Sequence, residues 1–144
     1  MSLSEKDVQR FIEICRVPFD GYTDDGRTKR AYARLGKRVA AALADALDEG
    51  SANVRWNKAG VAVAGDVRMH GDRIAVYFMG GPAFFQEPAQ FFYRRVEGRK
   101  DYTGHQNRWL PYSSLGGLGD DPNNCAAVMS MRAALLRPTG RRGI

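Results

Sequence analysis

The hydrophobic pattern of the chain changes its period near Gly50. Before this residue, apolar side chains recur every three to four positions, as on the buried face of a helix. From Ala52 onward they alternate or cluster in short runs that are typical of strands. A helical pattern returns only at the end, in Cys125–Arg137. Helices grouped at the two ends of the chain, around a block of strands, predict an α+β fold rather than alternating β-α-β units.

Two helices are expected before Gly50. The first spans Ser2–Arg16, with Ser4 as its N-cap and Asp7 three residues later, and it ends because Pro18 follows. The second, Thr23–Glu49, is rich in helix-forming residues. Its apolar stripe consists of Tyr32, Leu35, Val39, Leu43 and Leu47.

The middle of the chain predicts a small antiparallel sheet of three to four strands in meander order. Val61–Met69 and Arg73–Met79 are strands, and the turn residues His70-Gly71-Asp72 join them as a hairpin. Phe91–Val96 has strand character again, and Arg108–Leu110 follows just before a proline. The sheet would be packed by the two N-terminal helices and one C-terminal helix.

Other segments have weaker patterns. Asn53–Trp56 is short and extended. Ser113–Asn124 contains three glycines and a proline and is expected to be a mobile loop, at whose end Asn123 or Asn124 caps the last helix. Residues 1–138 are expected to form a single domain, and residues 139–144 a basic flexible tail.

The net charge is +6 and most of it comes from arginine, with seventeen Arg against five Lys. A GC-rich genome would explain this excess through codon usage. A polyanionic partner would explain it too, because arginine makes bidentate contacts that lysine cannot make. Both explanations stay open. Since the N-terminus is charged and no run reaches the ~18 apolar residues of a membrane span, we expect a cytoplasmic protein without a membrane partner.

Candidate binding residues fall into two groups. Arg27, Arg30, Arg34 and Arg38 share one face of the second helix, which is either a ridge for anions or an ordinary solvated surface. The second group mixes aromatic and basic side chains, as single-stranded nucleic-acid binding requires. Its members are Arg94, Arg95, Arg99, Lys100, Tyr102, Arg108 and Trp109. The competing interpretation places Phe91, Tyr93 and Trp109 in the core of the sheet.

Motifs for catalysis are weak. His105 is the best candidate for a general acid or base, with Asp101 to orient it and Arg99 or Arg108 to clamp an anion. A solvated loop histidine is the alternative. Metal-ligand spacings and phosphate-binding loops are absent from the sequence, so we expect neither a metal nor a cofactor. Cys15 and Cys125 are expected to be free buried thiols, although a disulfide stays open.

The segment YRRVEGRKDYTGHQNRWLPYSSL, residues 93–115, resembles small uncharacterised proteins of phages and other bacterial mobile elements. The resemblance covers 23 residues and carries no known active site. It implies an accessory protein of a mobile element, and such proteins often bind nucleic acid or inhibit a host protein.

The leading hypothesis is a non-catalytic basic protein that binds nucleic acid or an acidic protein surface. A separate hypothesis is a protein that occupies another protein's nucleic-acid site. The alternative is a small enzyme with an acid/base site in the Asp101–Trp109 loop. The two arginine groups provide a criterion. On one shared face they would favour a polyanion site, whereas on opposite faces they would be ordinary surface charge.

Overall fold

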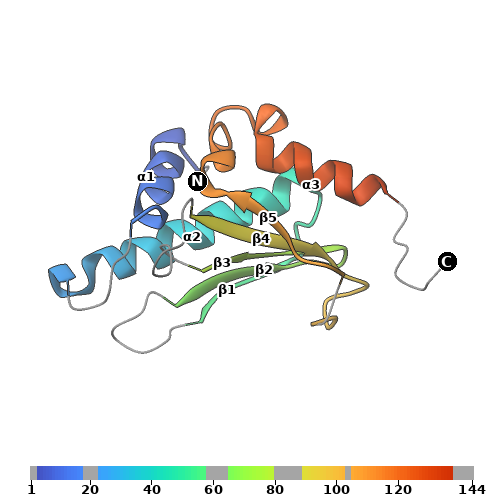
Figure 1. Ribbon diagram of the computed structural model, residues 1–144, viewed down its shortest axis with the longest axis horizontal. Helices are drawn as coiled ribbons and strands as arrows, with labels where there is room; N and C mark the ends of the chain where they lie inside the picture. The colour runs from blue at the N-terminus through green and yellow to red at the C-terminus, as the bar shows by residue number, and fades with distance from the viewer. Residues whose placement is uncertain (1–2, 18–22, 58–64, 80–88, 103–104, 138–144) are drawn as a thin grey trace.

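The computed structural model of the chain describes residues 3–17, 23–57, 65–79, 89–102 and 105–137. This part consists of three α-helices packed on an antiparallel sheet with strand order β1-β2-β3-β4-β5 (Figure 1). The α+β class and the meander order are confirmed, but the sheet has five strands, not three to four. The helices are α1 (Glu5–Cys15), α2 (Arg27–Ala46) and α3 (Ala126–Leu136). The strands are β1 (Asn53–Asn57), β2 (Asp66–His70), β3 (Ile74–Phe78), β4 (Gln90–Arg95) and β5 (Arg108–Pro111).

The two edge strands account for the difference in strand number. β1 pairs with β2 along its whole length, from Asn53 opposite His70 to Asn57 opposite Asp66. β5 is short and ends at Pro111, a residue that an edge strand tolerates because it cannot donate to a further neighbour. The predicted hairpin is confirmed, since Gly71 N donates to the carbonyl of Ile74 between β2 and β3. Its first strand begins at Asp66, and residues 61–64 of the predicted strand Val61–Met69 lie outside the described residues.

The sheet has one face covered by helices and one face that no helix in the described residues covers. Side chains alternate between the two faces along each strand. On one face, Val67, Val76 and Phe91 are among the residues that join the helices in the main hydrophobic core. On the opposite face, Tyr77 and Phe92 are among the residues of a separate small cluster. We call this opposite side the open face. β3 is buried on both faces, as its sequence predicts.

The helices begin and end close to the predicted residues. The Ser4 hydroxyl accepts from Asp7 N at 3.1 Å, which confirms the N-cap of α1. α2 starts four residues later than predicted, because a 3-10 turn precedes it and Gly26 has a φ of 77°. Its five stripe residues are all buried. α2 ends at Ala46, and the buried carboxylate of Glu49 then accepts from Arg73 N at 2.8 Å, which ties this end to the hairpin turn.

The segment predicted as a mobile loop is ordered. It contains two 3-10 turns, Tyr112–Leu115 and Pro122–Asn124, and it buries Leu115 and Leu118 in the core. The residue at the N-cap of α3 is Cys125, with no side-chain cap hydrogen bond, so the prediction that Asn123 or Asn124 caps this helix is wrong. The predicted tail lies outside the described residues.

Two further predictions concern the cysteines and membrane-spanning segments. Cys15 and Cys125 are both free and both buried. Among the helices of the described ranges, none is long and apolar enough to cross a bilayer.

Candidate functional site

The two groups of arginines lie at opposite ends of the molecule. The first group is in the N-terminal half of α2, and most of the second group follows the end of β4, at the other end of the longest axis (Figure 1). α2 packs on the helix-covered side of the sheet, whereas Arg94 projects from the open face. By the criterion set from the sequence, the helix arginines do not extend the second group into one basic surface.

Three of the four helix arginines bind within the chain. Arg27 and Arg30 donate to main-chain carbonyls of the preceding 3-10 turn, at 3.2 and 3.1 Å. Arg38 forms an ion pair with Asp7 of α1 at 3.0 Å. Arg34 is exposed. Charges of this kind are typical of a solvated helix face.

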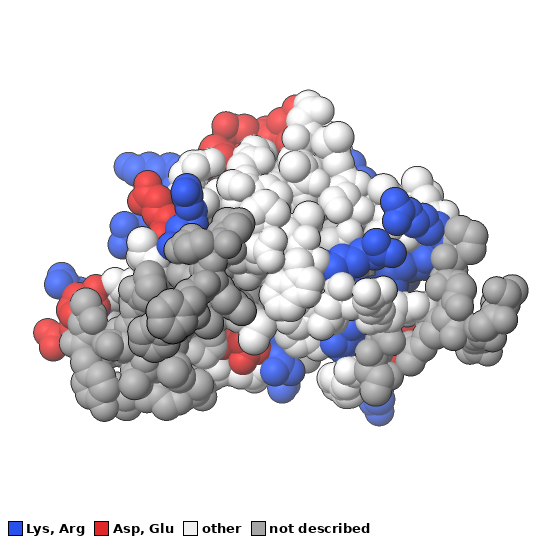
Figure 2. Space-filling model, in the orientation of Figure 1, with Lys and Arg blue, Asp and Glu red and all other residues white. Residues whose placement is uncertain are grey.

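The second group is spread over both sides of the sheet. Arg95 Nη1 donates to the carbonyl oxygen of Arg137, at the end of α3, at 2.5 Å. Arg99 pairs with Asp72 of the hairpin turn at 3.1 Å. Lys100 and Arg108 are exposed. Figure 2 shows basic side chains gathered where β4 ends and β5 begins, with a band of uncharged surface beside them.

His105 is held within its own loop. Its Nε2 lies 3.0 Å from Oε1 of Glu97, and its main-chain N donates to the carbonyl of Arg95. The Asp101 carboxylate accepts from Glu97 N at 2.8 Å. The carboxylate against the imidazole Nε2 is therefore that of Glu97, where the sequence suggested Asp101. An acid/base role for His105 stays a prediction.

The loop between β4 and β5 folds back over part of the open face. A ring nitrogen of His70 lies 3.3 Å from the carbonyl of Gly98, and Arg94 Nη2 donates to the carbonyl of Asp101 at 3.4 Å. The ring of Tyr102 meets the His70 ring edge-on at 5.2 Å. Burial lowers the pKa of His70, and the Gly98 carbonyl only partly opposes this effect. Several polar contacts of this loop are therefore made to side chains of the sheet.

A row of five side chains crosses the rest of the open face, one from each strand. Arg55 lies opposite Arg68, Arg68 opposite Tyr77, Tyr77 opposite Phe92, and Phe92 opposite Trp109. Three aromatic residues thus occupy one end of the row and two arginines the other. We call these five residues the transverse row.

Four members of the row, from Arg68 to Trp109, pack against one another along it. The Arg68 guanidinium carbon lies 4.9 Å from the ring centroid of Tyr77. The rings of Tyr77 and Phe92 stack at 4.8 Å, and those of Phe92 and Trp109 lie 4.9 Å apart at an angle of 50°. These four side chains therefore form a packed ladder.

The two arginines of the row differ in whether an acidic side chain neutralises them. The Arg68 Nε pairs with Asp66 Oδ2 at 2.5 Å. Arg55 is exposed, and its side chain has no ion pair or hydrogen bond to another residue of the described ranges. Arg94, next to the row, donates to the Tyr77 hydroxyl at 3.1 Å; it is 7% exposed, and its Nε has no partner in this part of the chain.

Some aromatic residues of Phe91–Trp109 are core residues, as the packing interpretation predicts, and others are exposed, as base stacking would require. Phe91 and Tyr93 are buried in the main core, as the packing interpretation predicts. Trp109 is 51% exposed on the open face and is not a core residue. Tyr102 is 67% exposed. Arg55, Arg68 and Tyr77 were missed by sequence reasoning.

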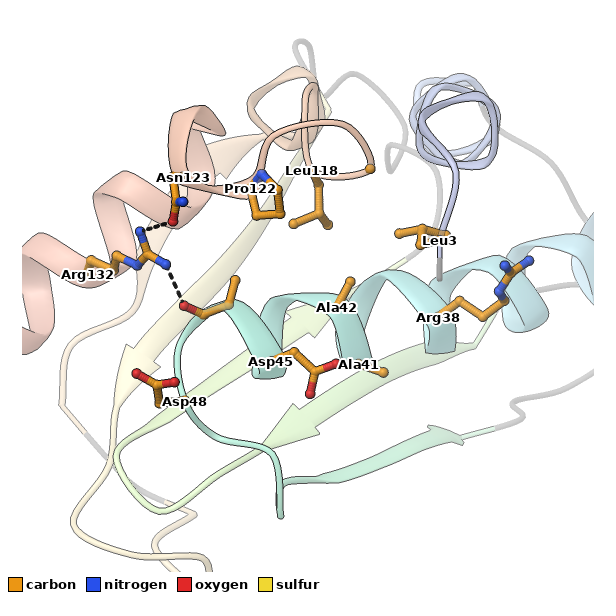
Figure 3. A pocket seen from close by; sticks show the side chains of 12 residues that line it. Leu3, Arg38, Ala41, Ala42, Asp45, Asp48, Leu118, Pro122, Asn123 and Arg132 are labelled. Carbon is orange, nitrogen blue, oxygen red and sulfur yellow. Dashed lines mark hydrogen bonds between the residues drawn. The ribbon is translucent and has the colours of Figure 1, made fainter. Parts of the chain in front are cut away.

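A groove of about 560 Å³ lies on the helix side, between α2 and residues 118–123 (Figure 3). Arg132 holds its two walls together, because it donates to the carbonyl of Ala46 at 2.8 Å and to Oδ1 of Asn123 at 2.9 Å. Neither His105 nor Asp101 lines it. Within the described ranges, no three His, Cys, Asp or Glu side chains come together as metal ligands would.

Comparison of the chain with protein-family models, with curated proteins and with solved structures gives no significant match.

Proposed function

We propose that the protein is a non-catalytic binding protein that holds single-stranded nucleic acid across the open face of its sheet. The observation that carries the proposal is the transverse row, in which two arginines continue into three aromatic rings on a face free of described helices. Single-strand binding needs cationic groups for phosphates and aromatic groups for bases, side by side on a rigid support.

The arginine end of the row favours a polyanion. Arg55 and Arg68 lie directly opposite each other, and like charges in this position destabilise a sheet. Asp66 offsets only one of the two charges. A phosphate between the guanidinium groups would remove the repulsion and accept charge-assisted hydrogen bonds from both.

The aromatic end favours a ligand with flat apolar groups. Trp109 presents an indole that is 51% exposed and lies beside Phe92. Exposed aromatic rings next to arginine suit unpaired bases, which have a π-face in every case. Paired bases in a duplex offer no such face to a sheet of this kind.

A fluorescence titration tests the proposal. The chain has two tryptophans, so a Trp56→Phe background leaves Trp109 as the sole indole reporter. We expect single-stranded oligonucleotides to quench this emission at low salt, and the affinity to fall steeply as salt rises to about 200 mM. A duplex of equal length should bind more weakly and quench less. Unchanged Trp109 emission with every single strand at low salt would refute the proposal.

A competition with polyglutamate of matched charge distinguishes a nucleic-acid partner from an acidic protein surface. It supplies the anions without the bases. If polyglutamate binds as tightly as the oligonucleotide and displaces it, the partner is an acidic protein rather than nucleic acid. We infer from the resemblance of residues 93–115 that either activity would serve a phage or mobile element.

A further inference from the structure

Two rings of the transverse row, those of Tyr77 and Phe92, lie face to face. Tyr77 and Phe92 are stacked, with 10° between their planes and 4.8 Å between their centroids. Since β3 lies between β2 and β4, Arg68 reaches Tyr77 from the side opposite to Phe92. Both ring faces of Tyr77 are therefore occupied by members of the row.

Exposure follows from this arrangement. Tyr77 and Phe92 are each 8% exposed, whereas Trp109 is 51% exposed. The Trp109 ring is tilted by 50° to that of Phe92, and it ends the row because β5 is the edge strand, with no further strand in the described residues beyond it. The row therefore ends in an exposed aromatic ring on which another flat group can stack.

We propose that a single unpaired base stacks on the exposed ring of Trp109, and that the remainder of the strand is held through its phosphates. This inference rests on the proposed function and narrows it. Tyr77 and Phe92 do not receive bases; they fix the position of the Trp109 indole. The ligand is then a single strand of little sequence preference, of which one nucleotide is stacked.

The spacing of the row supports this division of roles. Trp109 and Arg68 are three strands apart, which is about 14 Å at the usual separation of neighbouring strands. A base on Trp109 and a phosphate at Arg68 therefore belong to different nucleotides. Phosphate contacts at Arg68 and Arg55 carry no information about the base sequence.

Tyr102 is the other exposed ring on this face. Its ring lies 5.2 Å from His70, which is on β2, three strands from Trp109. A base stacked on Trp109 does not reach it, because the intervening distance is several times the stacking separation of two rings. Tyr102→Ala is therefore a matched control for the loss of an exposed ring.

The experiment compares oligonucleotides of about eight sugar–phosphate units that differ only in their bases. One is fully abasic, one carries a single central adenine, and one carries two adjacent adenines. Binding of each is measured by fluorescence anisotropy at low salt. We expect the single adenine to bind about tenfold more tightly than the abasic chain. The second adenine should add at most about twofold, since it offers only a second way to fill one stacking position.

Variants identify the ring. Trp109→Ala should bind the single-adenine chain no better than the abasic chain, and Trp109→Phe should retain part of the difference. Tyr102→Ala should leave the difference unchanged. Circular dichroism checks that each variant is folded. We expect all of them to fold, because the substituted side chains are at least half exposed.

Three results would overturn the inference. A second adenine that adds another tenfold would show that two bases stack, and loss of the adenine effect in Tyr102→Ala would move the site to that ring. An adenine effect that survives in Trp109→Ala would exclude the proposed ring. All three leave single-strand binding itself intact. If neither natural nor abasic chains bind at low salt, the proposed function fails together with the inference.

Discussion

Arg55 on β1 and Arg68 on β2 face each other directly on the open side of the sheet, and among the described residues only Arg68 of the two has a carboxylate partner, Asp66. The protein thus keeps a repulsive pair where an attractive one would stabilise it. We predict that Arg55→Glu raises the free energy of unfolding by about 0.5 kcal/mol. The same change should weaken binding of single-stranded oligonucleotides at low salt several-fold. Urea denaturation and anisotropy measure the two effects separately.

Arg34→Glu is the matched control for this prediction. It makes the same change in net charge at an exposed position of α2, on the helix side of the sheet. Binding should fall much less in this variant, because its effect acts only through the screened long-range field. Equal loss of binding in both variants would mean that net charge, and not the open face, determines affinity.

Gly36 marks the closest approach of α2 to the sheet. A Cβ at this position would lie 2.9 Å from Val67 Cγ2 and 3.1 Å from Phe11 Cε1. Gly36→Ala gains about 1 kcal/mol of helix propensity but overpacks a buried contact, which costs about 1–3 kcal/mol. We expect a net loss of stability of about 1 kcal/mol in urea denaturation. Ala41→Gly, on the exposed side of the same helix, measures the propensity contribution by itself. A Gly36→Ala protein more stable than the wild type would show that the contact relaxes freely.

Which parts of this fold a sequence can predict follows from the range of the interactions involved. The stripe from Tyr32 to Leu47 depends on helical spacing alone, and all of it is buried. The hairpin between β2 and β3 depends on a local turn. The order in residues 113–124 depends on Glu5, more than a hundred positions away, whose carboxylate accepts from Gly117 N and Gly119 N. Composition alone therefore suggested a mobile loop.

The transverse row was harder to predict than the fold, because it depends on strand register. Arg68 and Tyr77 have nothing unusual in their sequence neighbourhood, and a slip of one residue would place them on the opposite face. Trp109 was a candidate both for base stacking and for the hydrophobic core. The pairing register of β5 with β4, which places Trp109 opposite Phe92, decides between the two. His105 drew attention by its residue type, yet its Nε2 contacts a carboxylate of its own loop.

Glu5 fastens α1 to the segment that follows β5. Its Oε2 accepts from Gly117 N and its Oε1 from Gly119 N, each at 2.9 Å. Glu5→Gln replaces one of these acceptors with an NH₂ group, so we predict a loss of about 1–2 kcal/mol in the free energy of unfolding. Lys6→Gln, at the exposed neighbouring position, is the control and should change stability little.

The pH dependence of stability gives a second test of Glu5. Burial raises the pKa of its carboxyl, but the hydrogen bonds from Gly117, Gln9 and Gly119 outweigh this effect and lower the pKa below its usual value. A folded-state pKa below the unfolded one gives stability that is present above about pH 4.5 and is lost as the pH falls further. The Gln variant should lack this part of the acid-induced loss. An unchanged acid profile would contradict the role given to the carboxylate.

His70 is the group expected to make stability depend on pH nearer neutrality. Burial lowers its pKa in the folded protein, the Gly98 carbonyl acts in the opposite direction, and the Arg94 charge lowers the pKa further. The unfolded chain therefore takes up a proton at higher pH than the folded one, and the free energy of unfolding should fall as the pH drops below about 6.5. His70→Gln cannot titrate but can still donate to the Gly98 carbonyl.

The measurement is denaturation of both proteins at about pH 7.5 and pH 5.5, a window that spans the unfolded pKa of histidine. The wild type should lose more stability between the two values than His70→Gln does. His105→Gln removes the other histidine of the chain and should keep the part of the loss that belongs to His70. If His70→Gln loses as much stability on acidification as the wild type, the loop is not held on the sheet by a neutral imidazole. The contact between His70 and Gly98 would then carry no pH-dependent stability.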